Sequence, residues 1–261
     1  MSALTLAGRR VLVTRAAHQA GKLSEGLRAL GAEPVEVPVL EICPPASFEL
    51  LDAALRQLNS YDWLILTSAN AVHALTERAG ALEIAVSQSA RLKVAAVGEA
   101  TASAARKAGL QVALVPKAYV AESLVEGLLQ SLQNQTSSQR ILLVRAAVAR
   151  DVIPDALHSA GAMVDIVDAY RNVLPEAAPE QLRKALQNGI DAATFTSSSS
   201  ATHLAEAAHA AGVAWPFADV PAISIGPITS QTLSDLGWPP AAEANPSDIS
   251  GLIAKVVDLI R

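Results

Sequence analysis

Asp191-Ala192-Ala193-Thr194-Phe195-Thr196-Ser197-Ser198-Ser199-Ser200-Ala201 is a short apolar run that ends in four consecutive serines and continues into an alanine-rich segment. This order predicts a buried strand, a tight turn and the start of a helix. Serine hydroxyls and unpaired helical N–H groups would then lie together at the carboxyl end of the strand, where an anion can bind. Capping of the helix is an equally ordinary role for the serines, so both interpretations stay open.

The same pattern occurs earlier in the chain, at a nearly constant offset. Residues 62–75 align with residues 191–204, so that Thr67-Ser68 matches Thr196-Ser197. Two more pairs of segments follow nearly the same offset: residues 10–16 with 140–146, and residues 97–101 with 225–229. We therefore interpret the chain as two copies of one α/β unit. Each copy has a strand that ends in Arg, one that ends in Thr-Ser and one that ends in Gly-x-x-Thr.

Bulk composition indicates a globular protein without a membrane or nucleic-acid partner. The 261 residues are 51% hydrophobic and 17% charged, with a net charge of −5, which suits two ordinary domains and gives no basic field for nucleic acid. The single cysteine, Cys43, excludes an internal disulfide and a cysteine-based zinc site. The first residues are too short for a signal-peptide core, and no apolar run reaches the roughly 18 residues of a membrane span. We expect a cytoplasmic protein.

Strands that alternate with helical patterns predict doubly wound parallel sheets, in which ligands bind at the carboxyl ends of the strands. The residues predicted at those ends carry hydroxyl, amide or guanidinium groups, or are glycines. They form our set of candidate binding residues: Arg15, Ser68, Asn70, Gly98, Thr101, Arg145, Thr196, Ser197, Ser198, Ser199, Gly226 and Thr229.

Each of these motifs also has a purely structural explanation. In Gly-x-x-Thr, glycine allows close backbone approach and threonine caps a helix. Arg15 and Arg145 are either clamps for a substrate carboxylate or partners of a neighbouring carboxylate in the protein. None of the motifs places a His, Cys or Asp as a nucleophile, and the five histidines form no i, i+4 pair, so we expect no metal.

Taken in order, six segments resemble uroporphyrinogen-III synthase, and the match runs nearly from end to end. Two positions differ: Ala16 stands where the family often has Pro, and Ala146-Ala147 stands where a Gly commonly follows the second Arg. Neither difference removes a hydroxyl or a guanidinium group. The segments are Val11-Leu12-Val13-Thr14-Arg15, Leu66-Thr67-Ser68-Ala69-Asn70-Ala71-Val72, Ala96-Val97-Gly98-Glu99-Ala100-Thr101, Ala169-Tyr170-Arg171, Phe195-Thr196-Ser197-Ser198-Ser199-Ser200-Ala201 and Ile225-Gly226-Pro227-Ile228-Thr229.

The resemblance implies two similar α/β lobes, joined by a two-stranded linker ladder, with a cleft between them. The repeat alone suggests lobes of residues 1–133 and 140–261. The family instead exchanges segments, which implies one lobe of residues 1–38 with 172–261 and another of residues 44–165. The linkers would then be residues 39–43 and 166–171.

The resemblance also implies the reaction. Hydroxymethylbilane, a linear tetrapyrrole, is cyclised to uroporphyrinogen III with loss of water and inversion of the last pyrrole ring, without a cofactor. Tyr170 belongs to the matching Tyr-Arg motif and is our candidate proton donor to the departing hydroxyl. We expect a monomer that has a transient contact with the preceding deaminase.

A second class of function fits the same repeat. Duplicated α/β lobes around a cleft also describe non-catalytic proteins that bind an anionic small metabolite and close by hinge motion. In that case the Ser, Thr and Arg groups hold the metabolite, and Tyr170 serves only for packing.

Overall fold

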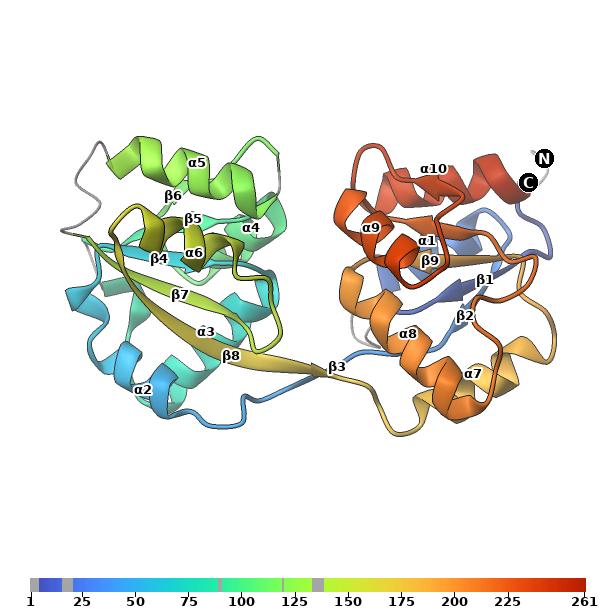
Figure 1. Cartoon of the computed structure of the whole chain (residues 1–261), viewed down its shortest axis with the longest axis horizontal. Helices are drawn as coiled ribbons and strands as arrows, with labels where there is room; N and C mark the ends of the chain where they lie inside the picture. Colours follow the sequence, from blue (N-terminus) through green and yellow to red (C-terminus); the bar gives the residue numbers. More distant parts are fainter. Residues whose placement is uncertain (1–4, 16–20, 89–90, 119, 133–138) are drawn as a thin grey trace. The chain divides into compact units, whose positions relative to one another are not determined.

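The chain forms two compact units, each with residues from both copies of the repeat. The computed structural model describes residues 5–15, 21–88, 91–118, 120–132 and 139–261 (Figure 1). One unit, called unit 1 here, contains Met1–Ile42 and Asn172–Arg261, and unit 2 contains Cys43–Arg171. The chain therefore crosses between the units within strand β3 (Glu41–Cys43) and within strand β8 (Met163–Val173).

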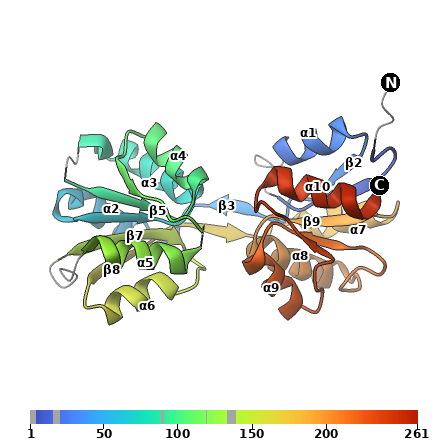
Figure 2. The same ribbon diagram turned by 90° about the horizontal axis from the view of Figure 1, so that it is seen from above.

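Unit 1 is a parallel sheet covered on both faces. Among the described residues its strand order is β11-β10-β9-β1-β2, and neighbouring strands run parallel. Figure 2 shows helices on both sides of this sheet. The strands are β1 (Arg10–Val13), β2 (Glu33–Glu36), β9 (Ala192–Phe195), β10 (Ala222–Ser224) and β11 (Ala242–Glu243). The helices are α1 (Gly21–Ala29), α7 (Ala178–Leu186), α8 (Ser198–Ala211), α9 (Pro227–Asp235) and α10 (Ile249–Ile260).

Alternate residues of the strands build two separate cores in unit 1. Val11 and Val13 of β1 point to the face covered by α1 and α10 and pack there with residues such as Leu252. Leu12 points to the opposite face and belongs to the core that contains Phe195 and residues of α7, α8 and α9. This two-sided burial explains why the strand sequences are continuously apolar.

Unit 2 repeats the same design. Among the described residues its sheet has the order β3-β8-β7-β4-β5-β6. Helix α3 packs on β4 and β7 beside α2 and α4, whereas α5 and α6 cover the other face (Figure 2). The strands not yet bounded are β4 (Trp63–Leu66), β5 (Lys93–Ala96), β6 (Val112–Leu114) and β7 (Arg140–Ala146). The helices are α2 (Glu49–Arg56), η2 (Leu58–Ser60), α3 (Ala69–Ala81), η3 (Val86–Gln88), α4 (Glu99–Lys107), α5 (Ala121–Leu132) and α6 (Val152–Ser159).

The sheet topology confirms the parallel α/β fold predicted from the repeat. The strand series β7, β4, β5 and β6 in unit 2 has the same neighbours and directions as β1, β9, β10 and β11 in unit 1. In each unit, the Arg strand of one copy pairs with the Thr-Ser strand of the other copy. The units are thus related by the repeat, although neither is a continuous copy of it.

Two equivalent aspartates fix this exchanged pairing. The backbone N–H of Arg10 donates to Asp191 Oδ2 at 2.7 Å, and the backbone N–H of Arg140 donates to Asp62 Oδ2 at 3.0 Å. Each aspartate N–H in turn donates to the carbonyl oxygen of the same arginine, at 2.8 Å for Asp191 and 2.9 Å for Asp62. The repeated Asp is therefore a register marker at the start of its strand.

Two equivalent glycines end helices of the repeat. Gly31 follows α1 with φ of 88°, and Gly161 follows α6 with φ of 84°. Glycine adopts this left-handed conformation without the strain that a Cβ atom would bring. The described part of the chain contains no helix that is both long and apolar enough to cross a membrane.

Candidate functional site

Tyr170 and Ser68 meet at the carboxyl end of the sheet of unit 2. Tyr170 lies on β8, is 6% exposed, and is the register partner of Ala146 at the end of β7. Its hydroxyl oxygen lies 3.0 Å from Ser68 Oγ, and its hydroxyl also has a side-chain hydrogen bond with Asn70. The structure therefore brings three of the candidate residues into contact.

Burial keeps the Tyr170 phenol protonated. Loss of hydration raises the pKa of Tyr170 above its usual value of 10.0, and the hydrogen bonds from Ser68 and Asn70 lower it by less. At neutral pH the group is thus a neutral hydrogen-bond donor that can give up a proton when a stronger base forms beside it.

Ser68 also begins helix α3. It is the N-cap residue, and its Oγ accepts from the backbone N–H of Ala71 at 3.0 Å. Because that bond uses a lone pair of Oγ, the serine hydroxyl proton remains available to the Tyr170 oxygen. The position of Tyr170 is in this way tied to the first turn of α3, whose dipole favours negative charge.

The serine cluster of unit 1 divides into different roles. Ser197 is the N-cap of α8 and forms a reciprocal capping box with Ser200, at 3.1 Å and 3.3 Å. Ser198 Oγ donates to the carbonyl oxygen of Ile228 at 3.3 Å and accepts from Thr232 Oγ1 at 2.8 Å, so it joins α8 to α9. Ser199 and Thr196 are half-buried. These contacts support a structural role for Ser197 and Ser198.

The Gly-x-x-Thr motifs begin α4 and α9, but threonine is not the cap as the sequence suggested. Gly98 and Gly226 are the N-cap residues of the two helices. Thr101 and Thr229 lie inside the first turns and are only 5% and 4% exposed. Because a glycine N-cap has no side chain to accept hydrogen bonds, the N–H groups of both first turns are left for other acceptors, although Pro227 at the first position of α9 has none.

The equivalent arginines Arg15 and Arg145 have different surroundings. Arg145 Nη1 donates to Asp151 Oδ1 at 2.7 Å, and its Nε lies 3.7 Å from Asp168 Oδ1. The Nε atoms of both arginines are buried and have no hydrogen-bond partner among the described residues, and burial lowers the pKa of the Arg15 guanidinium. The ion pairs of Arg145 fit the structural alternative, whereas Arg15, which has no ion pair among the described residues, fits a binding role. The partners Asp151 and Asp168 were not predicted, since nothing in the repeat marks them.

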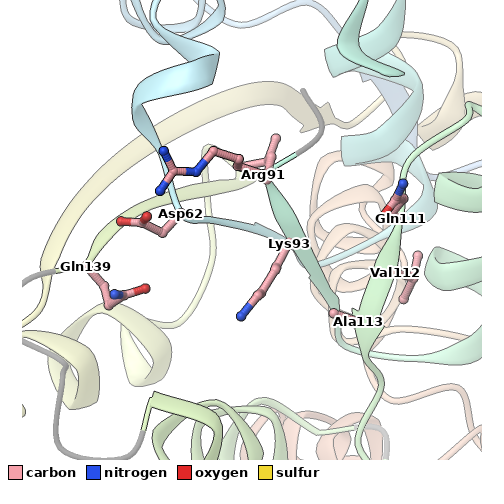
Figure 3. Close-up of a pocket in the computed structure, with 8 residues that line it drawn as sticks. Asp62, Arg91, Lys93, Gln111, Val112, Ala113 and Gln139 are labelled. Carbon is pink, nitrogen blue, oxygen red and sulfur yellow. The ribbon is translucent and has the colours of Figure 1, made fainter. Parts of the chain in front are cut away.

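A pocket of about 520 Å³ lies elsewhere in unit 2, at the amino ends of its strands (Figure 3). Its lining includes Asp62, Arg91, Lys93 and Gln139, which stand at or just before the starts of β4, β5 and β7. None of the candidate binding residues lines it. In the described part of the chain, no group of three or more His, Cys, Asp or Glu side chains could hold a metal ion.

Comparisons with known proteins place the chain in one family. The family model described as uroporphyrinogen-III synthase HemD matches residues 21–254. A curated uroporphyrinogen-III synthase from Synechococcus elongatus is 36% identical, over 98% of this chain and 97% of that protein. A putative uroporphyrinogen-III synthase from Methanothermobacter thermautotrophicus is 31% identical, over 86% of this chain and 88% of that protein.

A solved structure has the same fold. It is a mutant uroporphyrinogen III synthase from the extremely thermophilic bacterium Thermus thermophilus, with a TM-score of 0.67 and 20% identity over 97% of this chain and 99% of that one. The family model covers most of the chain, and the identity to the curated synthase extends over nearly the whole chain. The chain belongs to the uroporphyrinogen-III synthase family.

Proposed function

We propose that this chain cyclises hydroxymethylbilane to uroporphyrinogen III, with inversion of the terminal pyrrole ring and loss of water, in tetrapyrrole biosynthesis. Membership of the family supports the reaction. The observation that carries the assignment to residues is the buried Tyr170 hydroxyl, held by Ser68 and Asn70 at the carboxyl edge of the sheet.

Tyr170 is the proton donor in this proposal. The terminal carbon–oxygen bond of the substrate breaks as the pyrrole nitrogen releases electrons into the ring, and the phenol proton goes to the departing oxygen, which leaves as water. The remaining cation is then attacked by the substituted carbon of the last ring to give a spiro intermediate, which rearranges to the inverted macrocycle. The proton that the last ring loses on closure returns to the phenolate. Because electron release from nitrogen drives the departure, a weak acid suffices. Ser68 stabilises the phenolate by donating to it.

Candidate residues at two helix N-termini, together with one arginine, hold the substrate. Its carboxylates are bound by the helix N-termini at Gly98 and Gly226, whose N–H groups are free of a side-chain cap, and by the guanidinium of Arg15. Binding of this kind needs no basic surface, which agrees with the net charge of −5. Spontaneous closure gives the uninverted ring, so the main contribution of the protein is to hold the chain in the conformation that inverts.

The alternative, a non-catalytic binder of an anionic metabolite, is less well supported, because the family comparisons name synthases. The deciding experiment is a coupled assay in which porphobilinogen passes through a deaminase and the uroporphyrinogen isomers are separated. We expect isomer III in proportion to the amount of this protein. Isomer I alone, at any protein concentration, would support the binder instead.

Three further expectations belong to the proposal. The lobes are residues 1–38 with 172–261 and residues 44–165, with linkers at 39–43 and 166–171; the division of the chain into unit 1 and unit 2 supports this. The protein acts as a cytoplasmic monomer. It receives its substrate through a transient contact with the deaminase, because hydroxymethylbilane closes spontaneously when free. Light scattering with and without the deaminase measures both the mass and the contact.

A further inference from the structure

The loop that follows β7 in unit 2 lies directly beside Tyr170. It contains Ala147, Val148, Ala149, Arg150 and Asp151 and leads into α6. The backbone N–H of Ala147 donates to the carbonyl oxygen of Tyr170 at 2.9 Å. The loop therefore belongs to the same edge of the sheet as the proposed proton donor.

Both ends of this loop are held by specific contacts. Besides the bond from Ala147, Asp151 Oδ1 accepts from Arg145 Nη1 at 2.7 Å. Arg150 Nη1 donates to Glu122 Oε1, at the start of α5, at 3.0 Å. These contacts fix the position of the loop tip.

The tip of the loop is apolar and exposed. Val148 is 89% exposed, the highest value among the exposed large hydrophobic residues that the structure describes, and its neighbours are alanines. Loop tips usually carry Gly, Pro, Asn, Asp or Ser. A single exposed valine is by itself ordinary. What distinguishes Val148 is its place on an anchored loop whose first residue bonds to Tyr170.

We propose that Val148 is a substrate-contact residue, whose isopropyl group packs on the face of a pyrrole ring when the tetrapyrrole binds. This inference rests on the proposed function. The carboxylates of the substrate are on side chains of the rings, so the ring faces are its apolar surface. Burial of exposed aliphatic area against such a face favours binding. The anchored ends of the loop reduce the entropy that binding would otherwise cost.

The test compares substitutions at Val148 with one at Met163. Val148→Thr keeps the branched shape and replaces a methyl with a hydroxyl, and Val148→Asp adds a charge that repels a polycarboxylate. Met163 is a matched control, because it is 54% exposed in the same unit but lies at the amino end of β8, away from the carboxyl ends of the strands. Steady-state kinetics use hydroxymethylbilane supplied directly, and melting temperature and isomer ratio are recorded for each variant.

We expect KM to rise about threefold to tenfold in Val148→Thr and further in Val148→Asp. Because the contact exists in both the bound substrate and the transition state, kcat and the isomer ratio should stay at wild-type values. Met163→Thr should leave KM unchanged. If Val148→Asp still forms isomer III and its KM stays within about twofold of the wild type, the inference is overturned. Wild-type protein that forms no isomer III would overturn the proposed function and this inference with it.

Discussion

The hydroxyl oxygen of Tyr170 lies 3.0 Å from Oγ of Ser68, although 102 positions separate the two residues in the chain. Ser68 caps α3, so the phenol is attached to the first turn of a helix whose N-terminus favours negative charge. A phenol held in this way can release its proton while the charge that develops on its oxygen is stabilised.

Ser68→Ala is expected to lower the stability of the protein and to raise the pKa of Tyr170. Loss of the N-cap should lower the free energy of unfolding by about 1 kcal/mol. Loss of the hydrogen bond to the phenol should raise the pKa of Tyr170 further, because that bond lowers it, and should reduce kcat by roughly tenfold. Urea denaturation, NMR titration of labelled tyrosine and single-turnover kinetics measure the three effects.

Ser197 offers a matched control for Ser68. It is the equivalent N-cap in unit 1 and accepts from the N–H of Ser200 at 3.1 Å. Ser197→Ala should cost about the same stability and leave the Tyr170 titration as in wild type. An equal shift of the Tyr170 pKa in both variants would mean that the contact between Ser68 and Tyr170 does not lower that pKa.

Stability should fall at alkaline pH because of the buried tyrosines. The pKa of Tyr170 is raised in the folded state above its usual 10.0, and Tyr61 shifts in the same direction through burial and its bond to Asp165. Below pH 10 the folded and the unfolded protein both keep these phenol protons, so the stability contributed by the protonated tyrosines is fully present. Above that pH the unfolded chain loses protons that the folded chain retains, and the free energy of unfolding falls until the folded pKa is passed.

Tyr170→Phe should therefore show a shallower loss of stability between pH 9 and 11 than the wild type, as measured by urea denaturation at each pH. Tyr61→Phe should behave in the same way. Identical slopes for all three proteins would show that the two phenols titrate alike in the folded and unfolded states.

Arg15 and Arg145 should respond in opposite ways to substitution by Gln. Arg15→Gln removes a half-buried cation that has no ion pair among the described residues, so KM should rise about tenfold with little loss of stability. Arg145→Gln removes the partner of Asp151 and Asp168 and should lower the melting temperature more than it changes KM. Kinetics and calorimetry on both variants test the comparison. A raised KM for Arg145→Gln at wild-type stability would instead assign Arg145 to substrate binding.

Asp62→Ala should lower the free energy of unfolding by about 1–3 kcal/mol. The change leaves the backbone N–H of Arg140 without its carboxylate acceptor at the junction of the two repeat copies. Asp191→Ala should have an effect of similar size, since its carboxylate accepts from the N–H of Arg10. Urea denaturation of each variant provides the measurement, and a loss below about 0.5 kcal/mol would exclude the proposed register role.

The strands and their order along the chain were predictable because the repeat places equal motifs at equal offsets. The partner of each strand was not predictable from the repeat. Pairing of Leu12 with Ala193 joins segments that lie far apart in the chain, and local sequence similarity says nothing about which copy supplies a neighbour. Only the resemblance to a known family indicated the exchange of segments.

The chemistry of the site was predictable in kind and less so in detail. A serine after a strand signals a helix start, and Ser68 and Ser197 both have that role. The sequence could not tell that Ser68 also contacts a phenol, whereas Ser198 bonds to Ile228 on a neighbouring helix. These differences come from tertiary contacts that adjacent residues do not encode.

The role of Tyr170 as proton donor is tested most sharply by the isomer ratio that Tyr170→Phe forms in the coupled assay. The substitution keeps the packing of the ring and removes only the hydroxyl that contacts Ser68. We expect turnover about 10²–10⁴-fold slower, or somewhat less affected, with more of the uninverted isomer from spontaneous closure. Wild-type turnover and a wild-type isomer ratio in a folded variant would contradict this role and would assign the proton to water or to the substrate itself.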